Sequence, residues 1–263
     1  MSAEKGYKPA RLGDSPPAAL TCQLVETSAR WVPIPVQDGS YDGFLQLPAS
    51  GSGPGLILLQ EIFGVGDFLT SRAAELAGEG YVVLCPDMFW RVEARVALPH
   101  TEESMGAAFS YMQRFAAQPA ELTRSDLVAS LDALRARPEV TGPVGVMGYC
   151  LGGRLAYELA VASDPDCCVS YYGSGIGAEL DQAEHLRCPT LFHYGGADPY
   201  IDSAEIEAVR EAFAARPEVE VVVQPEAGHA FENYQAPMFH DASAAAVSWP
   251  ITLAFLQRNL HRS

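Results

Sequence analysis

Short apolar runs alternate with amphipathic stretches along most of the chain. The apolar runs are continuous and bounded by turn residues, which is the pattern of strands buried on both faces. They cover residues 55–60, 81–85, 144–147, 168–172, 190–194 and 219–224. Apolar residues at helical spacing predict helices over 68–79, 102–116, 121–137, 150–163, 203–215 and 242–259. This alternation predicts an α/β fold with a mostly parallel, doubly wound sheet flanked by helices.

The N-terminal part of the chain has a different pattern. Residues 1–25 are rich in proline, alanine and charge without periodicity, and we expect them to form an extended arm. Two strand-like runs, Trp31–Val36 and Tyr41–Leu47, flank an Asp38-Gly39 turn and predict an antiparallel hairpin. Neither a repeat nor a break in composition follows, so residues 26–263 are expected to form a single domain.

The charge balance argues against nucleic acid and anionic membrane surfaces as partners. The 263 residues include 33 acidic and 17 basic side chains, for a net charge of −16, and no basic run occurs. No apolar stretch reaches the roughly 18–20 residues of a membrane span, and the first residues lack the apolar core of a signal peptide. We therefore expect a cytoplasmic protein that acts on a small molecule, as a monomer or a homodimer.

The cysteines and the first turn of the predicted sheet bear on cofactors. The six cysteines form no CxxC pair and have no histidine at zinc-ligand spacing, so neither a disulfide framework nor a metal site is predicted. The first buried run is followed by Glu61-Ile62-Phe63-Gly64 rather than by the glycine-rich turn that binds dinucleotides. A dinucleotide cofactor is therefore disfavoured.

One turn has the pattern of a nucleophile elbow. In Gly148-Tyr149-Cys150-Leu151-Gly152 an apolar strand turns sharply into an alanine-rich helix, and glycines stand where a side chain would clash. A cysteine at a helix N-terminus faces backbone dipoles that lower the pKa of a thiol, and the Leu151 amide is available to a developing oxyanion. We predict that Cys150 is the nucleophile of an acyl transfer. The alternative is an unreactive, buried cysteine at a glycine-rich turn.

A nucleophile elbow predicts an acid after a later strand and a histidine after the last strand, in that order. Asp198 follows the run 190–194 and a Gly-Gly turn, at the carboxyl end of a predicted strand, where the sites of α/β sheets gather. His229 lies in a small-residue loop after the run 219–224. Each alone could be a turn or loop residue, but their order predicts Asp198 as the orienting carboxylate and His229 as the base.

Four segments carry a resemblance to a known family. Gln60–Val65, Cys85–Phe89, Gly148–Gly153 and Ala227–Phe231 resemble segments of the dienelactone hydrolases, also called carboxymethylenebutenolidases, and the likeness extends from about residue 30 to the end of the chain. The resemblance implies an α/β-hydrolase fold and hydrolysis of dienelactone, a lactone of chlorocatechol breakdown. It also implies a Cys-His-Asp triad that works through an acyl-enzyme, with no metal or cofactor.

The resemblance adds residues to the site. It implies that the triad is Cys150, His229 and Asp198, that Glu61 pairs with the resting thiol and helps to release the thiolate, and that two amides form the oxyanion hole. These are the amides of Ile62 and Leu151. The chemistry agrees, because a carboxylate beside a thiol can accept its proton and can also hold the resting cysteine unreactive.

The chain departs from the family where the substrate would bind. In the family two arginines hold the carboxylate of the substrate. Arg91 matches the first, but Asn233, four residues after His229, replaces the second, and an acid, Glu232, precedes it. Recognition of a carboxylate should therefore be weaker, and a neutral or bulkier ester is the expected substrate.

The residues expected to bind this substrate are Phe63, Trp90, Arg91, Tyr172 and Asn233. Arg91 has an alternative as a solvated loop arginine, and Tyr172 has one as a packing residue. We predict a cysteine-dependent hydrolase of a small ester or lactone. The alternatives on the same triad are a promiscuous carboxylesterase or thioesterase and an organophosphate triester hydrolase. The alternative without catalysis is a redox-sensing protein that uses Cys150 as a switch.

Overall fold

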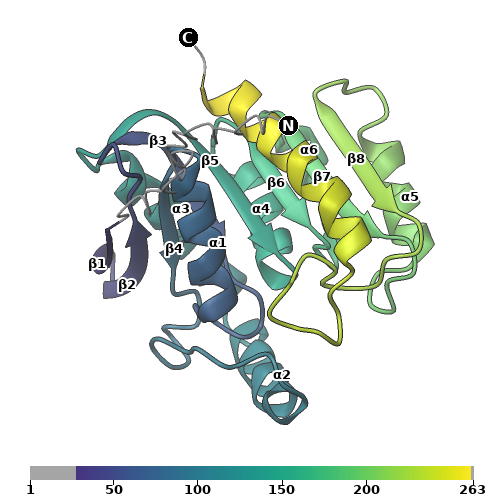
Figure 1. Ribbon diagram of the computed structural model, residues 1–263, viewed down its shortest axis with the longest axis horizontal. Coiled ribbons are helices and arrows are strands. Elements are labelled where there is room, and N and C mark those ends of the chain that lie inside the picture. The colour runs from purple at the N-terminus through teal and green to yellow at the C-terminus, as the bar shows by residue number, and fades with distance from the viewer. Residues whose placement is uncertain (1–27, 262–263) are drawn as a thin grey trace, which may run out of the picture.

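An eight-stranded sheet organises residues 28–261, the part of the chain that the computed structural model describes (Figure 1). Its strands are β1 (Ala29–Val36), β2 (Gly39–Gln46), β3 (Gly53–Leu59), β4 (Val82–Pro86), β5 (Val140–Tyr149), β6 (Cys168–Tyr171), β7 (Thr190–Gly195) and β8 (Val219–Gln224). They lie in the order β1-β2-β4-β3-β5-β6-β7-β8. In the part of this order that runs β4-β3-β5-β6-β7-β8, each strand is parallel to its neighbours. Parallel neighbours need crossover connections, which the helices between them supply.

The first two strands form the hairpin that the sequence predicts. β1 pairs antiparallel with β2 around the Asp38-Gly39 turn, and β2 pairs antiparallel with β4. The hairpin therefore adds two antiparallel strands to one edge of the parallel sheet. The predicted fold class, a mostly parallel α/β sheet with an N-terminal hairpin, is confirmed.

Helices cover both faces of the sheet. They are α1 (Asp67–Gly78), α2 (Glu102–Ala116), α3 (Ala120–Arg135), α4 (Leu151–Ala162), α5 (Ser203–Ala212) and α6 (Ala242–Leu260). A Cβ at Gly145 of β5 would meet Leu260 of α6. A Cβ at Gly55 of β3, which pairs with Val144, would meet Leu134 of α3. Because Val144 and Gly145 are successive residues and point to opposite faces, α3 and α6 lie on opposite sides of the sheet.

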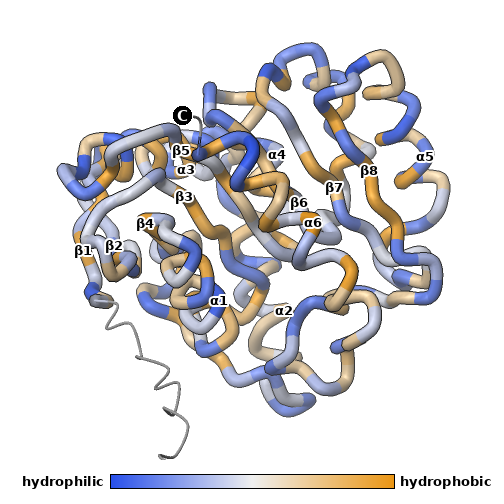
Figure 2. Tube along the Cα trace, turned by 45° about the horizontal axis from the view of Figure 1, so that its top comes forward, coloured by the Kyte–Doolittle hydropathy of each residue, from blue (hydrophilic) through white to orange (hydrophobic). Residues whose placement is uncertain are grey.

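The centre of the sheet is apolar, and the residues of the predicted site lie at the carboxyl ends of its parallel strands. The side chains from Leu56 to Leu59 in β3 have no exposed surface, and Figure 2 shows this strand largely in the apolar colours. Since parallel strands run in the same direction, the carboxyl ends of β3, β5, β7 and β8 lie at the same edge of the sheet. The segments that follow these four strands carry Glu61, Cys150, Asp198 and His229.

Two parts of the chain differ from the sequence-based expectation or lie beyond it. A 3₁₀ helix, η1 (Ile176–His185), follows β6, where no element was predicted. The predicted arm, residues 1–25, lies outside the described residues. Within residues 28–261, every helix is too short or too polar to cross a membrane.

Candidate active site

Cys150 lies at the turn between β5 and α4, in a backbone conformation with φ 54° and ψ −117° that few non-glycine residues adopt. The turn is tight. A Cβ at Gly148 would lie 2.0 Å from the carbonyl oxygen of Gly152, and a Cβ at Gly152 would lie 2.3 Å from that of Leu59. Both positions therefore need glycine. The result is a partly exposed thiol at the N-terminus of α4, as the glycine spacing predicts.

The other described cysteines have a different environment. Cys85, Cys167, Cys168 and Cys188 are buried, whereas Cys150 is partly exposed. Burial raises the pKa of the thiols of Cys85, Cys168 and Cys188. A buried thiol that keeps its proton is a poor nucleophile. Cys150 is partly exposed and also has a histidine, His229, at hydrogen-bond distance.

His229 connects Cys150 to Asp198. Its Nε2 lies 3.1 Å from the Sγ of Cys150, and its Nδ1 lies 2.7 Å from Oδ2 of Asp198. The other oxygen of Asp198 accepts a hydrogen bond of 2.8 Å from the amide of Tyr200, which fixes the carboxylate. The structure thus brings together the three residues predicted from chain order. A nucleophile, a base and an orienting acid in this sequence of hydrogen bonds can activate a thiol for attack.

The surroundings of His229 favour its protonated form. Burial alone would lower the pKa of His229, but the charges of Cys150 and Asp198 and the hydrogen bonds with both outweigh burial and raise the pKa to about 10. A protonated imidazole at hydrogen-bond distance stabilises a thiolate. The geometry therefore suits a thiolate–imidazolium pair.

The loops that carry Asp198 and His229 are in close backbone contact. A Cβ at Gly195 would lie 2.4 Å from the carbonyl oxygen of Ala227, and the amide of Ala197 donates to that same oxygen at 3.0 Å. Glycine is therefore required where the acid's loop crosses the histidine's loop. This contact fixes the separation of the acid from the base.

Two backbone amides beside the thiol are candidates for the oxyanion hole. Leu151 is the first residue of α4, and the leading amides of a helix have no acceptor within the helix. Ile62 follows β3, lines the same pocket as Cys150, and belongs to an apolar cluster with Phe63 and Ala108 against which Cys150 and Leu151 pack. Both predicted donors thus lie next to Cys150, and the N-terminal end of α4 adds a positive potential there.

Glu61 lines the same pocket as Cys150 and His229. Its side chain is buried, and its Oε2 lies 2.7 Å from Nδ2 of Asn233 and 3.0 Å from Nε2 of His100. The resemblance implied a glutamate paired with the resting thiol, but in this structure the thiol contacts His229 instead. His100 is a site residue that the sequence left without a role, because no motif or strand end marks it.

The pocket beside Cys150 encloses about 180 Å³ and is mostly apolar. We call it the apolar pocket. Its wall includes Ile62, Phe63, Met105, Phe109, Met112 and Phe239. Three of these lie on one face of α2, at positions 105, 109 and 112, since residues three or four apart are neighbours on a helix. Among the predicted substrate-binding residues, Phe63 and Asn233 line this pocket, and its lining includes no lysine or arginine.

A second cavity of about 360 Å³ also opens on Cys150, between α2, α3 and α4. We call it the second cavity. Arg154 is the arginine of its lining, and its Nε lies 2.9 Å from Oε1 of Glu158. Arg154 also pairs with Glu179. The carboxylates of Glu158 and Glu179 thus offset the charge of Arg154. The thiol of Cys150 lies between the apolar pocket and this larger cavity, whose lining has mixed polarity.

Arg91 and Trp90, which were expected to bind substrate, lie outside the lining of both cavities at Cys150. Arg91 pairs with Asp126 at 2.8 Å and with Asp38 at 2.5 Å. Trp90 donates to Asp126 at 2.9 Å, and its ring stacks on Tyr41 with the centroids 5.1 Å apart. The two side chains join the hairpin to α3. The arginine that the resemblance matches to a carboxylate ligand is therefore paired with two aspartates of the chain itself.

Tyr172 also lies behind the site instead of lining it. Its side chain has no exposed surface, and its ring centroid is 5.2 Å from that of His229 and 5.3 Å from that of Phe231. Neither cavity at Cys150 includes it among its lining residues. The packing alternative therefore describes Tyr172, which supports the ring of the base from behind.

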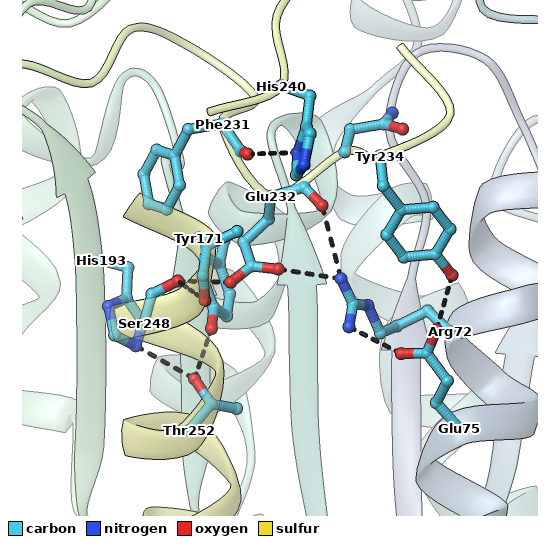
Figure 3. Close-up of polar contacts among 12 residues, drawn as sticks. Arg72, Glu75, Tyr171, His193, Phe231, Glu232, Tyr234, His240, Ser248 and Thr252 are labelled. Carbon is cyan, nitrogen blue, oxygen red and sulfur yellow. Dashed lines mark hydrogen bonds and ion pairs between the residues drawn. The ribbon is translucent and has the colours of Figure 1, made fainter. Parts of the chain in front are cut away.

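A network of buried polar side chains joins the histidine loop to α1 and α6 (Figure 3). We call it the buried network. Glu232 accepts hydrogen bonds from Arg72, at 2.8 Å, and from Ser248. Arg72 also pairs with Glu75 at 2.7 Å and lies 4.0 Å over the ring of Trp249. Burial raises the pKa of Glu232 to about 7, against the opposing effects of Arg72 and Ser248. Glu232 thus faces Arg72, away from the apolar pocket.

Comparison with known proteins gives consistent matches. The model of the dienelactone hydrolase family matches residues 41–260. A carboxymethylenebutenolidase of a Pseudomonas species is 36% identical over 84% of this chain and 91% of its own length. A carboxymethylenebutenolidase of Pseudomonas putida is 35% identical over 82% of this chain and 93% of its own length. A solved dienelactone hydrolase-like promiscuous phosphotriesterase from metagenomic libraries has a TM-score of 0.77 at 26% identity, over 89% of this chain and 99% of its own.

Proposed function

The chain belongs to the dienelactone hydrolase family, and from this premise we propose that it hydrolyses a neutral, apolar ester or lactone with Cys150 as the nucleophile. Membership confirms the coarser prediction of a hydrolase that acts on ester or lactone bonds. One observation carries the finer proposal. The hydrogen-bonded series Cys150–His229–Asp198 opens on a pocket whose lining has no lysine or arginine.

The first half-reaction forms a thioester. The Sγ of Cys150 bonds to the carbonyl carbon, and the charge moves to the carbonyl oxygen, to which the amides of Ile62 and Leu151 donate. When the tetrahedral intermediate collapses, the bond to the leaving oxygen breaks. His229 gives that oxygen the proton from its Nε2, and Asp198 holds the imidazole in the orientation that this transfer needs.

The second half-reaction releases the acid. A water oxygen attacks the carbonyl carbon of the thioester, His229 takes the water proton, and the carbon–sulfur bond breaks to restore the thiolate. In a lactone the leaving oxygen stays attached to the acyl group. When it leaves as an enolate, without the proton of His229, it stays beside the thioester as a base that takes the water proton in place of His229, which offsets slow deacylation.

The charges of the site favour a neutral substrate. The apolar pocket presents the carboxylate of Glu61 and no lysine or arginine to a ligand, and His229 already pairs with Asp198 and Cys150, so a substrate carboxylate would meet a like charge without a free cation. Phe63, Phe109 and the methionines of α2 instead offer apolar surface, which favours burial of apolar groups. Two cavities meet at Cys150, so the acyl and alkoxy groups of an ester can occupy separate spaces.

The test compares kcat/KM of the wild type and Cys150→Ala on trans-dienelactone and on a neutral aryl acetate at the same pH. We expect the wild type to favour the neutral ester and Cys150→Ala to lose both activities. Cys188→Ala, at a buried cysteine, is the matched control and should keep both. An active Cys150→Ala would overturn the nucleophile. A strong preference for dienelactone would overturn the neutral substrate class.

A phosphotriester is the second candidate substrate. The observation that favours it is the structural neighbour that is a promiscuous phosphotriesterase, together with a pocket suited to neutral molecules, because a phosphotriester carries no charge. An aryl dialkyl phosphate added to the same panel tests it. If Cys150→Ala removes both activities, one nucleophile serves both substrates. If only the ester activity is lost, phosphotriester hydrolysis belongs to other residues.

A further inference from the structure

A second histidine–carboxylate pair borders the thiol. The Nε2 of His100 lies 3.0 Å from Oε2 of Glu61, and the two side chains are 5% and 6% exposed. Glu61 lines the apolar pocket together with Cys150, so the pair forms part of the surroundings of the nucleophile. The reaction steps above use Cys150, His229 and Asp198 and leave His100 without a role.

The carboxylate of Glu61 needs a partner for an electrostatic reason. Two negative charges in one buried site repel each other, so an uncompensated carboxylate would oppose formation of the Cys150 thiolate. The Nδ2 of Asn233 donates to Oε2 of Glu61 at 2.7 Å, but an amide carries no charge. His100 contacts the same oxygen and is the partner that can also carry a positive charge.

The ring of His100 is held in place for this contact. Its centroid lies 4.2 Å from that of Phe63 and 6.1 Å from that of Phe68. The next residue, Thr101, is the N-cap of α2, and its side chain accepts a hydrogen bond from the first turn. His100 therefore connects Glu61 to the start of the helix whose apolar face lines the pocket.

We propose that His100 is a positioning residue for the hydrolysis: it holds the carboxylate of Glu61 against Asn233 and offsets its charge, so that the Cys150 thiolate forms beside it. The inference rests on the proposed role of Cys150 as the nucleophile. It also bears on specificity. Because the protein itself supplies the partner of Glu61, the pocket needs no cationic group on the substrate, which agrees with a neutral ester.

Two substitutions separate the hydrogen bond from the packing. His100→Gln keeps a donor but loses the ring, and His100→Phe keeps a ring against Phe63 and Phe68 but loses the donor. The measurement that needs no substrate is the rate at which iodoacetamide alkylates Cys150 at pH 7, with the site assigned by peptide mass mapping. A slower rate reports a smaller fraction of thiolate. His185→Gln, at an exposed histidine, is the control.

We expect His100→Phe to lower the alkylation rate by about threefold to tenfold, because the uncompensated carboxylate of Glu61 opposes the thiolate. His100→Gln should restore only part of the rate, because its amide can keep a hydrogen bond to Glu61 but carries no charge. The kcat for a neutral ester should fall in the same order while KM stays unchanged, because His100 acts on the nucleophile through Glu61. If His100 had a purely structural role, both variants would instead show the same fall in alkylation rate and kcat, together with lower melting temperatures.

Equal alkylation rates in the wild type and His100→Phe would overturn the proposal, as would equal losses in the Phe and Gln variants. The alkylation test is also independent of the natural substrate. If no ester is turned over but the two variants still differ in alkylation as expected, the proposed function fails and the role of His100 stands. If esters are hydrolysed and the variants do not differ, only the role of His100 fails.

Discussion

The segment from His229 to Asp241 has two faces with opposite chemistry. Toward Cys150 it presents His229, Ala230, Asn233 and Phe239 to the apolar pocket. On its other side Glu232 enters the buried network, in which it bonds with side chains of α1 and α6 (Figure 3). Consecutive residues of one loop thus serve a substrate surface and an internal anchor.

The difference between the two faces separates catalysis from anchoring. On the pocket face most of the surface is apolar, and its polar side chains include His229, which contacts Cys150, and Asn233, which contacts Glu61. In the buried network Arg72 is enclosed by aromatic rings and pairs with two carboxylates. Breaking a buried ion pair costs much more than its net contribution to stability, because one charge remains unpaired. We therefore expect pocket-face variants to change rates and selectivity, and network variants to change stability.

The largest expected effect comes from the pocket face. His229→Gln removes the base while an amide remains to bond with Asp198, so we expect kcat/KM for a neutral ester to fall by about 10²–10⁴-fold, the range typical of a lost general base. The melting temperature should fall less than in Arg72→Met, because the amide of glutamine can still donate a hydrogen bond to Asp198. Steady-state kinetics and a thermal scan on the same samples check both statements. A parallel loss of folding would contradict the separation of the two faces.

Arg72→Met tests the buried network. Methionine can keep the packing over Trp249, but Glu232 loses its cation, so at pH 8 we expect unfolding to become easier by about 3–5 kcal/mol. Urea denaturation measures this, and kcat per folded molecule should change little. The double variant Arg72→Met/Glu232→Leu is the control. It should recover part of the loss, because no charge remains buried without a partner.

Much of the fold and the meeting of Cys150, His229 and Asp198 could be predicted from motifs and from chain order. Gly148 and Gly152 mark a turn in which a Cβ would meet backbone atoms at 2.0–2.3 Å, and that constraint is written into five consecutive residues. Chain order supplied Asp198 and His229, since parallel strands place their carboxyl ends at one edge. The 3₁₀ helix η1 had no such local signal, and it was missed.

The substrate-binding residues were harder to predict because their positions depend on contacts between distant segments. Arg91 was expected at the pocket, but Asp38 and Asp126, both more than thirty residues away in the chain, hold it elsewhere. His100 reaches Glu61 across a similar separation of 39 residues. A motif gives the neighbours of a residue along the chain, whereas these roles depend on partners that only the folded chain brings together.

Asn233→Arg tests the selectivity of the pocket face. An arginine here would add a cation beside Glu61 in a pocket whose lining has no lysine or arginine. We expect the ratio of kcat/KM for a carboxylate-bearing lactone to that for a neutral ester to rise by about ten- to a hundredfold, the value of one charge-assisted hydrogen bond of roughly 1.5–3 kcal/mol. Asn233→Met controls for side-chain size. An unchanged ratio would show that position 233 does not select the charge of the substrate.

Glu232→Gln gives the smallest expected effect on activity, and its pH dependence sharpens the comparison. Burial raises the pKa of Glu232 in the folded chain from an ordinary 4.5 to about 7, so the folded state binds this proton more tightly than the unfolded state. The contribution of this group to stability is therefore full below about pH 4.5 and is lost as the pH rises through about 7. Glutamine cannot titrate. The stability lost on substitution should be larger at pH 5 than at pH 8, by roughly 2–3 kcal/mol.

Urea denaturation of the wild type and Glu232→Gln at pH 5 and pH 8 measures this difference. Glu75→Gln, which changes the exposed partner of Arg72, is the matched control. A loss that grows with rising pH would mean that attraction to Arg72 outweighs burial, so that the ion pair stabilises the fold in its charged form. In either case kcat at pH 8 should remain near the wild-type value, because Glu232 faces Arg72 and Ser248 and not the thiol. A large fall in kcat without a loss of stability would instead show that the buried network contributes to catalysis, so that the two faces do not act separately.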